Sequence, residues 1–233
     1  MSPEFLEELE LKSKILIINT MKLKVCGMKY QENIKAVAAL QPDYLGFIFY
    51  PKSPRNFEGD IPEMDENICK TGVFVNAPID FVVEKVKQYG FKAVQLHGSE
   101  SVAYCQELNR FDLNIELFKV FSIKDEFDFS VLANYEPFVN YFLFDTKGKE
   151  KGGNGYTFDW EVLKAYPSRK PFILSGGIGV EEIEKVKEIL KTDLPIEALD
   201  LNSKFETAPG VKDVALLKRF FEEVSGGDVR SEK

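Results

Sequence analysis

The feature of this sequence that most constrains its fold is a regular alternation of strand-like and helix-like segments. Short apolar runs typical of buried strands occur at Leu23–Cys26, Tyr44–Phe49, Lys70–Val75, Ala93–Leu96, Ile115–Phe121, Tyr141–Asp145, Phe172–Ser175 and Ala198–Asp200. Amphipathic stretches between them include Asn33–Leu40, Ile79–Tyr89, Val102–Asn109, Val180–Leu190 and Val211–Val224. The strands end about 25 residues apart, which is the rhythm of a (β/α)₈ TIM barrel.

A doubly wound open sheet is the competing α/β architecture. It favours a glycine-rich G-x-G-x-x-G turn after the first strand, and Cys26-Gly27-Met28 does not match that pattern. We therefore predict a single (β/α)₈ barrel over residues 21–224. Residues 1–20 do not join the alternation, so we expect a short N-terminal extension that is non-native or disordered. We expect residues 225–233 to be a disordered tail.

Composition excludes several classes of function. A formal net charge of −8 argues against a nucleic-acid partner, because phosphate backbones are bound by basic surfaces. Three widely spaced cysteines and one histidine offer neither a disulfide framework nor a metal site. No apolar run is long enough to span a membrane, and the acidic start is unlike a secretory signal. We expect a cytoplasmic enzyme without cofactor or metal, either monomer or homodimer.

In such barrels the chemistry takes place at the C-terminal ends of the strands. The helix cues include Ser99, an expected cap before Val102. The polar and glycine residues at or after the ends of the predicted strands form the candidate site: Cys26, Gly46, Arg55, Asn76, Gln95, His97, Asp145, Gly176, Gly177, Asp200, Asn202 and Ser203.

Cys26 and Asp145 end the first and sixth predicted strands and could form an acid/base pair. A lone cysteine is more often a small buried hydrophobe, and an aspartate at this position can equally be a turn or cap residue. Lys24 shares the face of Cys26, one residue pair deeper, and can supply positive potential to a thiolate. Because strands 1 and 8 are neighbours in a closed barrel, Lys24 and Asp200 are expected to face one another.

Two loops favour a phosphate site. Ser175-Gly176-Gly177-Ile178-Gly179 joins a strand to a helix, and Asp200-Leu201-Asn202-Ser203 follows the eighth strand. Glycine allows backbone N–H groups to approach an anion, and barrels often bind phosphate after strands 7 and 8. Plain turns are the alternative for each loop. The pair therefore predicts a small phosphorylated molecule as the substrate.

Three further segments have open interpretations. Arg55, in a rigid Ser53-Pro54-Arg55 loop, can hold a carboxylate bidentately or remain a solvated surface charge. Gln95 and His97 share one strand face, and His97 is either a substrate contact or a structurally bonded histidine. The glycine- and lysine-rich segment Lys147–Gly155 is either a mobile lid or an ordinary solvated loop.

Taken together, the motifs resemble those of the phosphoribosylanthranilate isomerase family. The resemblance runs from Met21 to about Phe221, in the family's order. It rests on these motifs: Lys24-Val25-Cys26-Gly27-Met28, Tyr44–Tyr50 with Ser53-Pro54-Arg55, Gly72–Asn76, Val94–Gly98, Phe144-Asp145, Gly152–Gly155 with Phe158-Asp159-Trp160, Leu174–Gly177 and Pro209–Asp213.

The resemblance implies a tryptophan-biosynthesis barrel that converts N-(5-phosphoribosyl)anthranilate to 1-(2-carboxyphenylamino)-1-deoxyribulose 5-phosphate by an Amadori rearrangement. By this likeness Asp145 is the general acid, Cys26 the general base, Arg55 the residue on the anthranilate carboxylate and Asp200 a substrate contact. Gly177 and Ser203 match the phosphate loops.

One position departs from the family's pattern. Lys204 stands where a glycine is common, so the loop backbone could differ there, or the lysine could supply charge to the phosphate. The residues alone predict a cofactor-free isomerase or lyase of a phosphorylated anion. The related aminoimidazole isomerase of histidine biosynthesis and a non-catalytic phosphate-binding barrel are the alternatives.

Overall fold

The structure is a computed structural model that describes residues 21–124, 126–146 and 160–224. The predicted extension 1–20, the predicted tail 225–233 and the predicted lid 147–155 lie outside the described residues.

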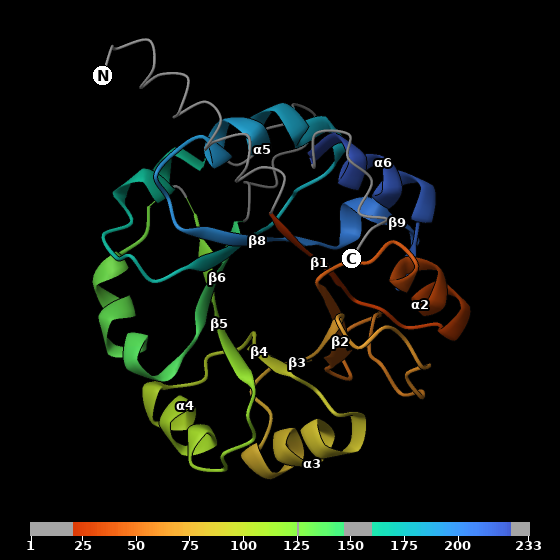
Figure 1. The fold of residues 1–233 in the computed structure, drawn as a ribbon. Coiled ribbons are helices and arrows are strands. Elements are labelled where there is room, and N and C mark those ends of the chain that lie inside the picture. The colour runs from red at the N-terminus through yellow and green to blue at the C-terminus, as the bar shows by residue number, and fades with distance from the viewer. Residues whose placement is uncertain (1–20, 125, 147–159, 225–233) are drawn as a thin grey trace, which may run out of the picture.

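Parallel strands form a closed ring in which each strand pairs with the next along the chain and β8 returns to β1 (Figure 1). This confirms the predicted (β/α)₈ barrel. The eight strands are β1 (Lys22–Cys26), β2 (Tyr44–Phe49), β3 (Cys69–Phe74), β4 (Ala93–Leu96), β5 (Glu116–Ile123), β6 (Tyr141–Thr146), β7 (Phe172–Ser175) and β8 (Ile196–Leu201).

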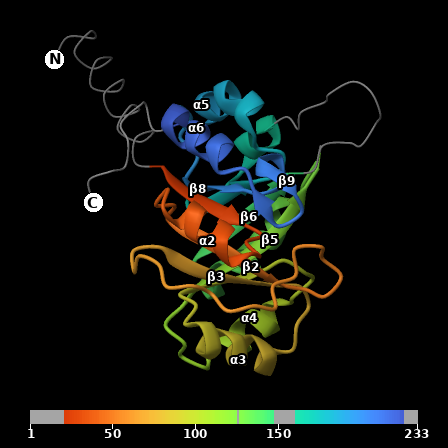
Figure 2. The same ribbon diagram turned by 90° about the vertical axis from the view of Figure 1, so that its right-hand side faces the viewer.

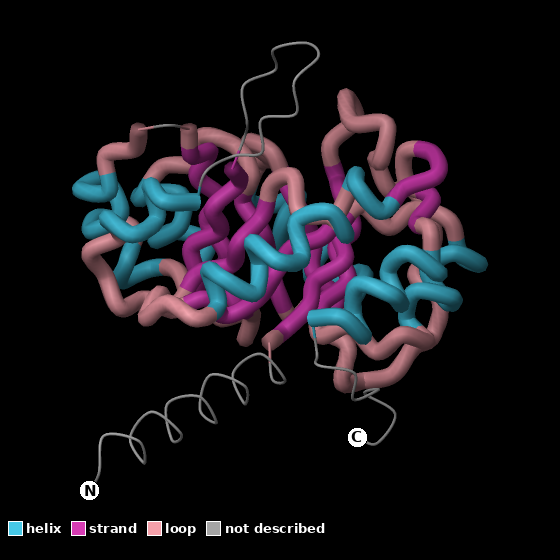
Figure 3. The backbone as a smooth tube through the Cα atoms, turned by 90° about the horizontal axis from the view of Figure 1, so that it is seen from above, coloured by secondary structure: helices cyan, strands magenta, loops and turns pink. Residues whose placement is uncertain are grey.

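Helices surround the ring, as the side view and the tube view show (Figures 2 and 3). In Figure 2, α3 and α4 lie on one side of the strands, whereas α5 and α6 lie on the opposite side. The α-helices are α2 (Gln31–Ala38), α3 (Ile79–Tyr89), α4 (Val102–Asn109), α5 (Ile183–Leu190) and α6 (Val214–Val224). Short 3₁₀ turns supplement them: η1 (Phe129–Asn134), η2 (Glu136–Phe138), η3 (Trp160–Ala165), η4 (Val180–Glu182) and η5 (Ser203–Phe205).

Helix α3 shows how sequence spacing produces an element. Val82, Val83 and Val86 are buried along one face, as their i+3, i+4 and i+7 spacing from Ile79 predicts. The helix ends at Gly90, whose left-handed φ of 63° allows its N–H to reach the carbonyl of Val86. The buried valines therefore form the packed face of the helix, and the Gly90 bond ends it.

The structure corrects the expected cap of α4. Ser101, not Ser99, occupies the N-cap, and its hydroxyl accepts a hydrogen bond from the Tyr104 N–H at 3.2 Å. Ser99 instead bonds Asn76 through both its backbone N–H and its hydroxyl. The cap therefore directly precedes the helix, and Ser99 ties two loops together.

The predicted helix Val211–Val224 is too long at its start. Val211–Lys212 forms β10, which pairs antiparallel with β9 (Glu206–Ala208), and Gly210 turns between them with φ 84°. The helix Val180–Leu190 likewise begins as the 3₁₀ turn η4 and becomes α-helical only at Ile183. In both cases apolar periodicity continues through residues whose backbone serves another element.

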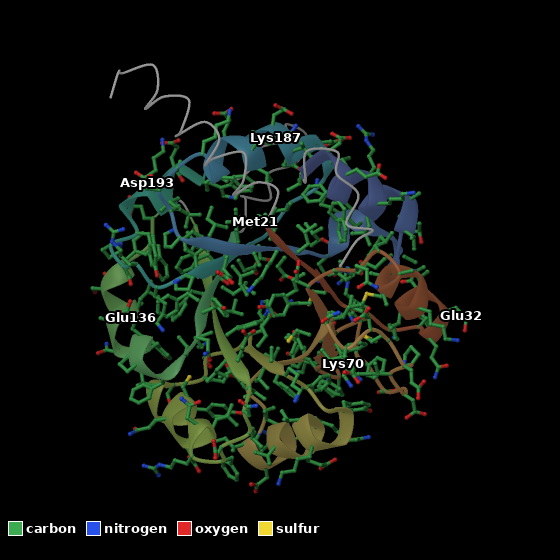
Figure 4. The ribbon with its side chains drawn as sticks, viewed as in Figure 1. Met21, Glu32, Lys70, Glu136, Lys187 and Asp193 are labelled. Atoms are coloured by element: carbon green, nitrogen blue, oxygen red, sulfur yellow. The ribbon has the colours of Figure 1, made fainter. Side chains whose placement is uncertain are left out.

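The barrel interior and the outer shell form separate apolar clusters. The inner cluster consists of Tyr44, Ala93, Phe118, Val120, Leu143, Ile173 and Ala198. A larger cluster joins outward-facing strand residues to the helices. Charged side chains such as Glu32 and Asp193 lie on the outside, whereas Met21 is buried where the chain enters β1 (Figure 4). No helix in the described ranges is long and apolar enough to cross a bilayer.

Candidate active site

One cavity of about 610 Å³ gathers most of the candidate residues. From the predicted set, its wall contains Cys26, Gln95, His97, Asp145, Gly176, Gly177, Asp200, Asn202 and Ser203. Arg55, Gly46 and Asn76 belong to the predicted set but do not line this cavity. Ile48, Val73, Ser175, Ile178 and Lys204 complete the wall. The closed ring therefore brings together residues 177 positions apart in the chain, from Cys26 to Ser203.

Cys26 lies at the end of β1 against the neighbouring strand. Its Cα is in register with Gly46 on β2. A Cβ added at Gly46 would stand 2.9 Å from the Cys26 Sγ and 3.2 Å from the Lys24 Nζ. Glycine at position 46 is therefore required, because the thiol and the ammonium both pack over its backbone.

Lys24 and Asp200 form a buried ion pair beneath the thiol, as predicted from the neighbouring strands. Strands β1 and β8 lie side by side in the ring (Figure 1), and Lys24 and Asp200 are in register across them. Lys24 Nζ lies 2.8 Å from Asp200 Oδ1. Their side chains are 0% and 5% exposed. Ser175 donates its hydroxyl to the second Asp200 oxygen at 3.2 Å, which extends the network onto β7.

The protonation of Cys26 is set by opposing effects. Burial raises the pKa of the thiol because the thiolate loses its hydration. The nearby Lys24 ammonium lowers the pKa of the thiol by its charge and a hydrogen bond, whereas the negative charge of Asp200 raises it. A second buried cation, Lys212, also lowers the pKa of the thiol. Forming the thiolate thus depends on these two lysines.

Asp145 and His97 approach one another on the cavity wall. Asp145 ends the aromatic run of β6, and its Oδ2 is 3.7 Å from His97 Nε2. The Gln95 amide nitrogen lies 3.0 Å from His97 Nδ1. Because an amide nitrogen only donates, this orientation makes Nδ1 the acceptor and leaves the proton of a neutral ring on Nε2, facing Asp145. The remaining Gln95 oxygen is buried and has no hydrogen-bond partner among the described residues.

The two predicted phosphate loops meet at the same cavity. Gly176 and Gly177 have φ values of 95° and 68°, in the left-handed region that favours glycine. A Cβ at Gly177 would meet nothing within 4 Å, so its backbone conformation, not crowding, calls for glycine there. Lys204 lies in η5 beside Ser203 with a φ outside the left-handed region, so the lysine fits this backbone and also lines the cavity.

Arg55 forms an ion pair with Glu206, a contact that the sequence did not predict. Its Nε and Nη2 donate to both carboxylate oxygens of Glu206, at 2.5 to 3.0 Å. Lys212 donates to the same Glu206 at 2.7 Å and to the Asn202 side-chain oxygen at 2.7 Å. Burial alone raises the pKa of Glu206, but hydrogen bonds from Arg55 and Lys212 hold it below its ordinary value.

Glu206 and Lys212 are functional candidates with little local signal in the sequence. Glu206 is 151 residues from Arg55, so no spacing rule joins them. Lys212 falls in the motif Pro209–Asp213, which carried the family resemblance without any chemical role. Ser175 does have a signal in the sequence. It is the last residue of β7, and functional residues of such barrels lie at the C-terminal ends of the strands.

The comparisons with known proteins agree with this geometry. A family model described as N-(5'phosphoribosyl)anthranilate (PRA) isomerase matches residues 23–223. The N-(5'-phosphoribosyl)anthranilate isomerase of Parabacteroides distasonis is 41% identical over 210 residues, which cover 88% of this chain and 93% of the relative. That of Phocaeicola vulgatus is 38% identical and covers 88% of this chain and 98% of the relative.

Solved structures give the same result. The phosphoribosyl anthranilate isomerase of Thermotoga maritima superposes with a TM-score of 0.73 at 29% identity, covering 88% of this chain and 99% of that one. A phosphoribosyl anthranilate isomerase in complex with reduced 1-(o-carboxyphenylamino)-1-deoxyribulose 5-phosphate superposes with a TM-score of 0.71 at 26% identity, with the same coverage. This chain belongs to the N-(5'-phosphoribosyl)anthranilate isomerase family.

Proposed function

We propose that this chain isomerises N-(5-phosphoribosyl)anthranilate to 1-(2-carboxyphenylamino)-1-deoxyribulose 5-phosphate, the third step of tryptophan biosynthesis from chorismate, with Asp145 as the acid and Cys26 as the base. The observation that carries this proposal is that one cavity is lined by Cys26 and Asp145 together with the Gly176-Gly177 and Asn202-Ser203 loops. Its volume of about 610 Å³ is in the range of small-molecule sites.

The first step opens the ribose ring. Protonated Asp145 gives its proton to the furanose oxygen, the C1′–O bond breaks, and the anthranilate nitrogen lone pair forms the C1′=N bond. His97 supports this step, because its Nε2–H can bond the Asp145 carboxylate that remains. The nitrogen becomes an iminium, which makes the neighbouring C2′ proton acidic.

The second step moves the proton from C2′. The Cys26 thiolate removes it, and the electron pair forms the C1′=C2′ bond of an enolamine while the iminium is neutralised. The ketone results when C1′ gains a proton and the C2′ hydroxyl loses one. The sum is an isomerisation, so neither an oxidant nor a reductant is consumed.

Binding groups surround these two residues. Gly176, Gly177, Asn202 and Ser203 line the cavity together. In this proposal they hold the phosphate with backbone N–H and side-chain donors. The unpartnered Gln95 oxygen suits a substrate hydroxyl, because a buried acceptor without a donor is costly. Arg55 is the group for the anthranilate carboxylate, and Asp200 contacts the substrate from β8.

Turnover of phosphoribosylanthranilate, followed by loss of its anthranilate-type fluorescence, tests the function. Cys26→Ala and Asp145→Asn should each lower kcat by at least about 100-fold, the scale of general acid–base catalysis, with a smaller effect on affinity. Cys105→Ala is the matched control, because Cys105 is a buried cysteine on α4 that does not line the cavity. Near-wild-type turnover in Cys26→Ala or Asp145→Asn would show that the substituted residue is not the proposed base or acid.

A further inference from the structure

Arg55 uses only one edge of its guanidinium within the protein. The Nε and Nη2 groups form the side-on edge, and both donate to Glu206. Among the described residues, no hydrogen bond of the Arg55 side chain goes anywhere else. A planar guanidinium has a second, end-on edge formed by Nη1 and the outer Nη2 hydrogen. That edge can bind a second carboxylate in the same bidentate geometry.

The charges around Glu206 do not cancel. Arg55 and Lys212 contribute two positive charges, and Glu206 contributes one negative charge. The side chains of Glu206 and Lys212 are 4% and 0% exposed and that of Arg55 is 21% exposed, so water reaches the remaining positive charge only through Arg55. A buried cluster with one uncompensated positive charge favours an anionic ligand.

The cluster of Arg55, Glu206 and Lys212 adjoins the residue that follows Cys26. A Cβ added at Gly27, the residue after Cys26, would come within 2.8 Å of both the Arg55 Cδ and the Asn202 Oδ1. Asn202 belongs to the cavity wall as well. Since Lys212 occupies the Asn202 oxygen, the amide nitrogen is left to donate elsewhere.

The cluster is built on a rigid support. Asn33 on α2 bonds both the N–H and the carbonyl of Lys212, at 2.8 and 2.9 Å. The Gly210 N–H adds a further bond to Glu206 at 3.1 Å. Glu206 is therefore fixed by three neighbours before any ligand binds.

We propose that Glu206 is a positioning residue for substrate specificity: by holding the side-on edge of Arg55, it presents the end-on edge to the ring carboxylate of the substrate. This inference rests on the proposed function of Arg55. Arg55 recognises the carboxylate, and Glu206 supplies the geometry without touching the ligand.

The test compares two ligands on the folded protein, without turnover. The first is the reduced product analogue 1-(o-carboxyphenylamino)-1-deoxyribulose 5-phosphate, and the second is the same molecule without the ring carboxylate. In Glu206→Gln the amide has one acceptor oxygen in place of two, so Arg55 loses its fixed orientation. Binding of the first ligand should weaken by about 10- to 100-fold, whereas binding of the second should change less than about twofold.

Further variants separate positioning from a structural role. In an Arg55→Ala background, Glu206→Gln should cause no additional loss, because the two residues act through one contact. Glu223→Gln, which breaks the exposed Arg219–Glu223 pair on α6, is the matched control and should leave both affinities unchanged. Arg55→Lys should give the same selective loss, because a lysine cannot offer two parallel donors to the carboxylate. Glu206→Asp, which keeps the charge but withdraws the carboxylate from Arg55, should also lose the first ligand selectively and provides the test if Glu206→Gln fails to fold.

Equal weakening of the two ligands by Glu206→Gln, or the same loss in the Arg55→Ala background, would overturn the proposal. So would Arg55→Lys variants that bind both ligands as the wild type does. Failure of the proposed function has a different signature. In that case the wild-type protein itself would bind neither analogue and would not turn over phosphoribosylanthranilate.

Discussion

Apart from burial, the charge of Lys24 has the largest influence on the Cys26 thiol. Lys24→Met should therefore raise the pKa of Cys26 and shift the limb of the kcat/KM profile that reports the base to higher pH. Asp200→Asn should shift it to lower pH, because Asp200 adds to the rise. The rate of Cys26 alkylation by iodoacetamide against pH, in a background without Cys69 and Cys105, reports the thiolate directly.

The same strand contains a control for this experiment. Lys22 lies two residues before Lys24 and pairs with Glu197 at 2.6 Å, at the other end of the barrel. Lys22→Met should leave the alkylation midpoint of Cys26 where it is in the wild type. If Lys24→Met also leaves the midpoint unchanged, Lys24 is a structural residue only.

At the scale of the secondary-structure elements, the buried Glu100–Lys119 ion pair joins the loops that follow β3 and β4. Glu100 accepts hydrogen bonds from the backbone N–H groups of Asn76 and Gly98, and from Lys119 at 3.2 Å. The Glu100 and Lys119 side chains are 1% and 3% exposed. His97 lies within this fastened region, so the pair also fixes the wall beside Asp145.

Removing one partner of this pair should be costly. We expect Glu100→Gln to lower the free energy of unfolding by about 3 to 5 kcal/mol, because Lys119 would remain buried without its counter-charge. Chemical denaturation measures this loss. Glu32→Gln, which breaks the exposed Glu32–Lys35 pair, should cost less than about 0.5 kcal/mol. Equal costs for the two variants would show that the buried pair adds no stability to these loops.

At the scale of the whole molecule, Glu116 makes the free energy of unfolding depend on pH. It begins β5, at the N-terminal end of the barrel strands, opposite the cavity. Burial raises the pKa of Glu116, whose carboxylate accepts a hydrogen bond from the Tyr44 hydroxyl at 3.1 Å. A carboxyl with a raised pKa in the folded state binds its proton more tightly there than in the unfolded chain. Its contribution is fully present below the unfolded value of about 4.3 and is lost as pH rises through the folded value.

The variant Glu116→Gln should remove this contribution. Its free energy of unfolding should therefore fall less than that of the wild type as pH rises from about 4 towards neutrality. Denaturant titrations across this range measure the difference. Parallel profiles for the two proteins would exclude Glu116 as a source of the pH dependence.

The barrel and most of the residues that line its cavity could be predicted from the sequence, because both depend on local patterns. Strands of alternating or continuous apolar residues ended at the residues that line the cavity, such as Cys26 and Asp145. The register of β1 against β8 followed from closure, which made the Lys24–Asp200 pair predictable.

Other features depend on contacts that no local pattern reveals. The Arg55–Glu206 and Glu100–Lys119 pairs join side chains from different units of the barrel, so only the folded chain brings them together. The β9–β10 hairpin was missed because Val211 fits the apolar period of the following helix. No helix was predicted between β5 and β6, where the structure has the short 3₁₀ turns η1 and η2.

The Lys24–Asp200 pair has a consequence for folding. Its partners are 176 residues apart, and they meet only where the last strand closes the ring against the first. Contacts of such separation carry a large loop-closure entropy and are slow to form. A chain with an unclosed ring would contain a Cys26 thiol without its organised counter-charges. Cys26 therefore acquires its complete charged surroundings only when β8 pairs with β1, so the rate of Cys26 alkylation during refolding reports closure of the ring.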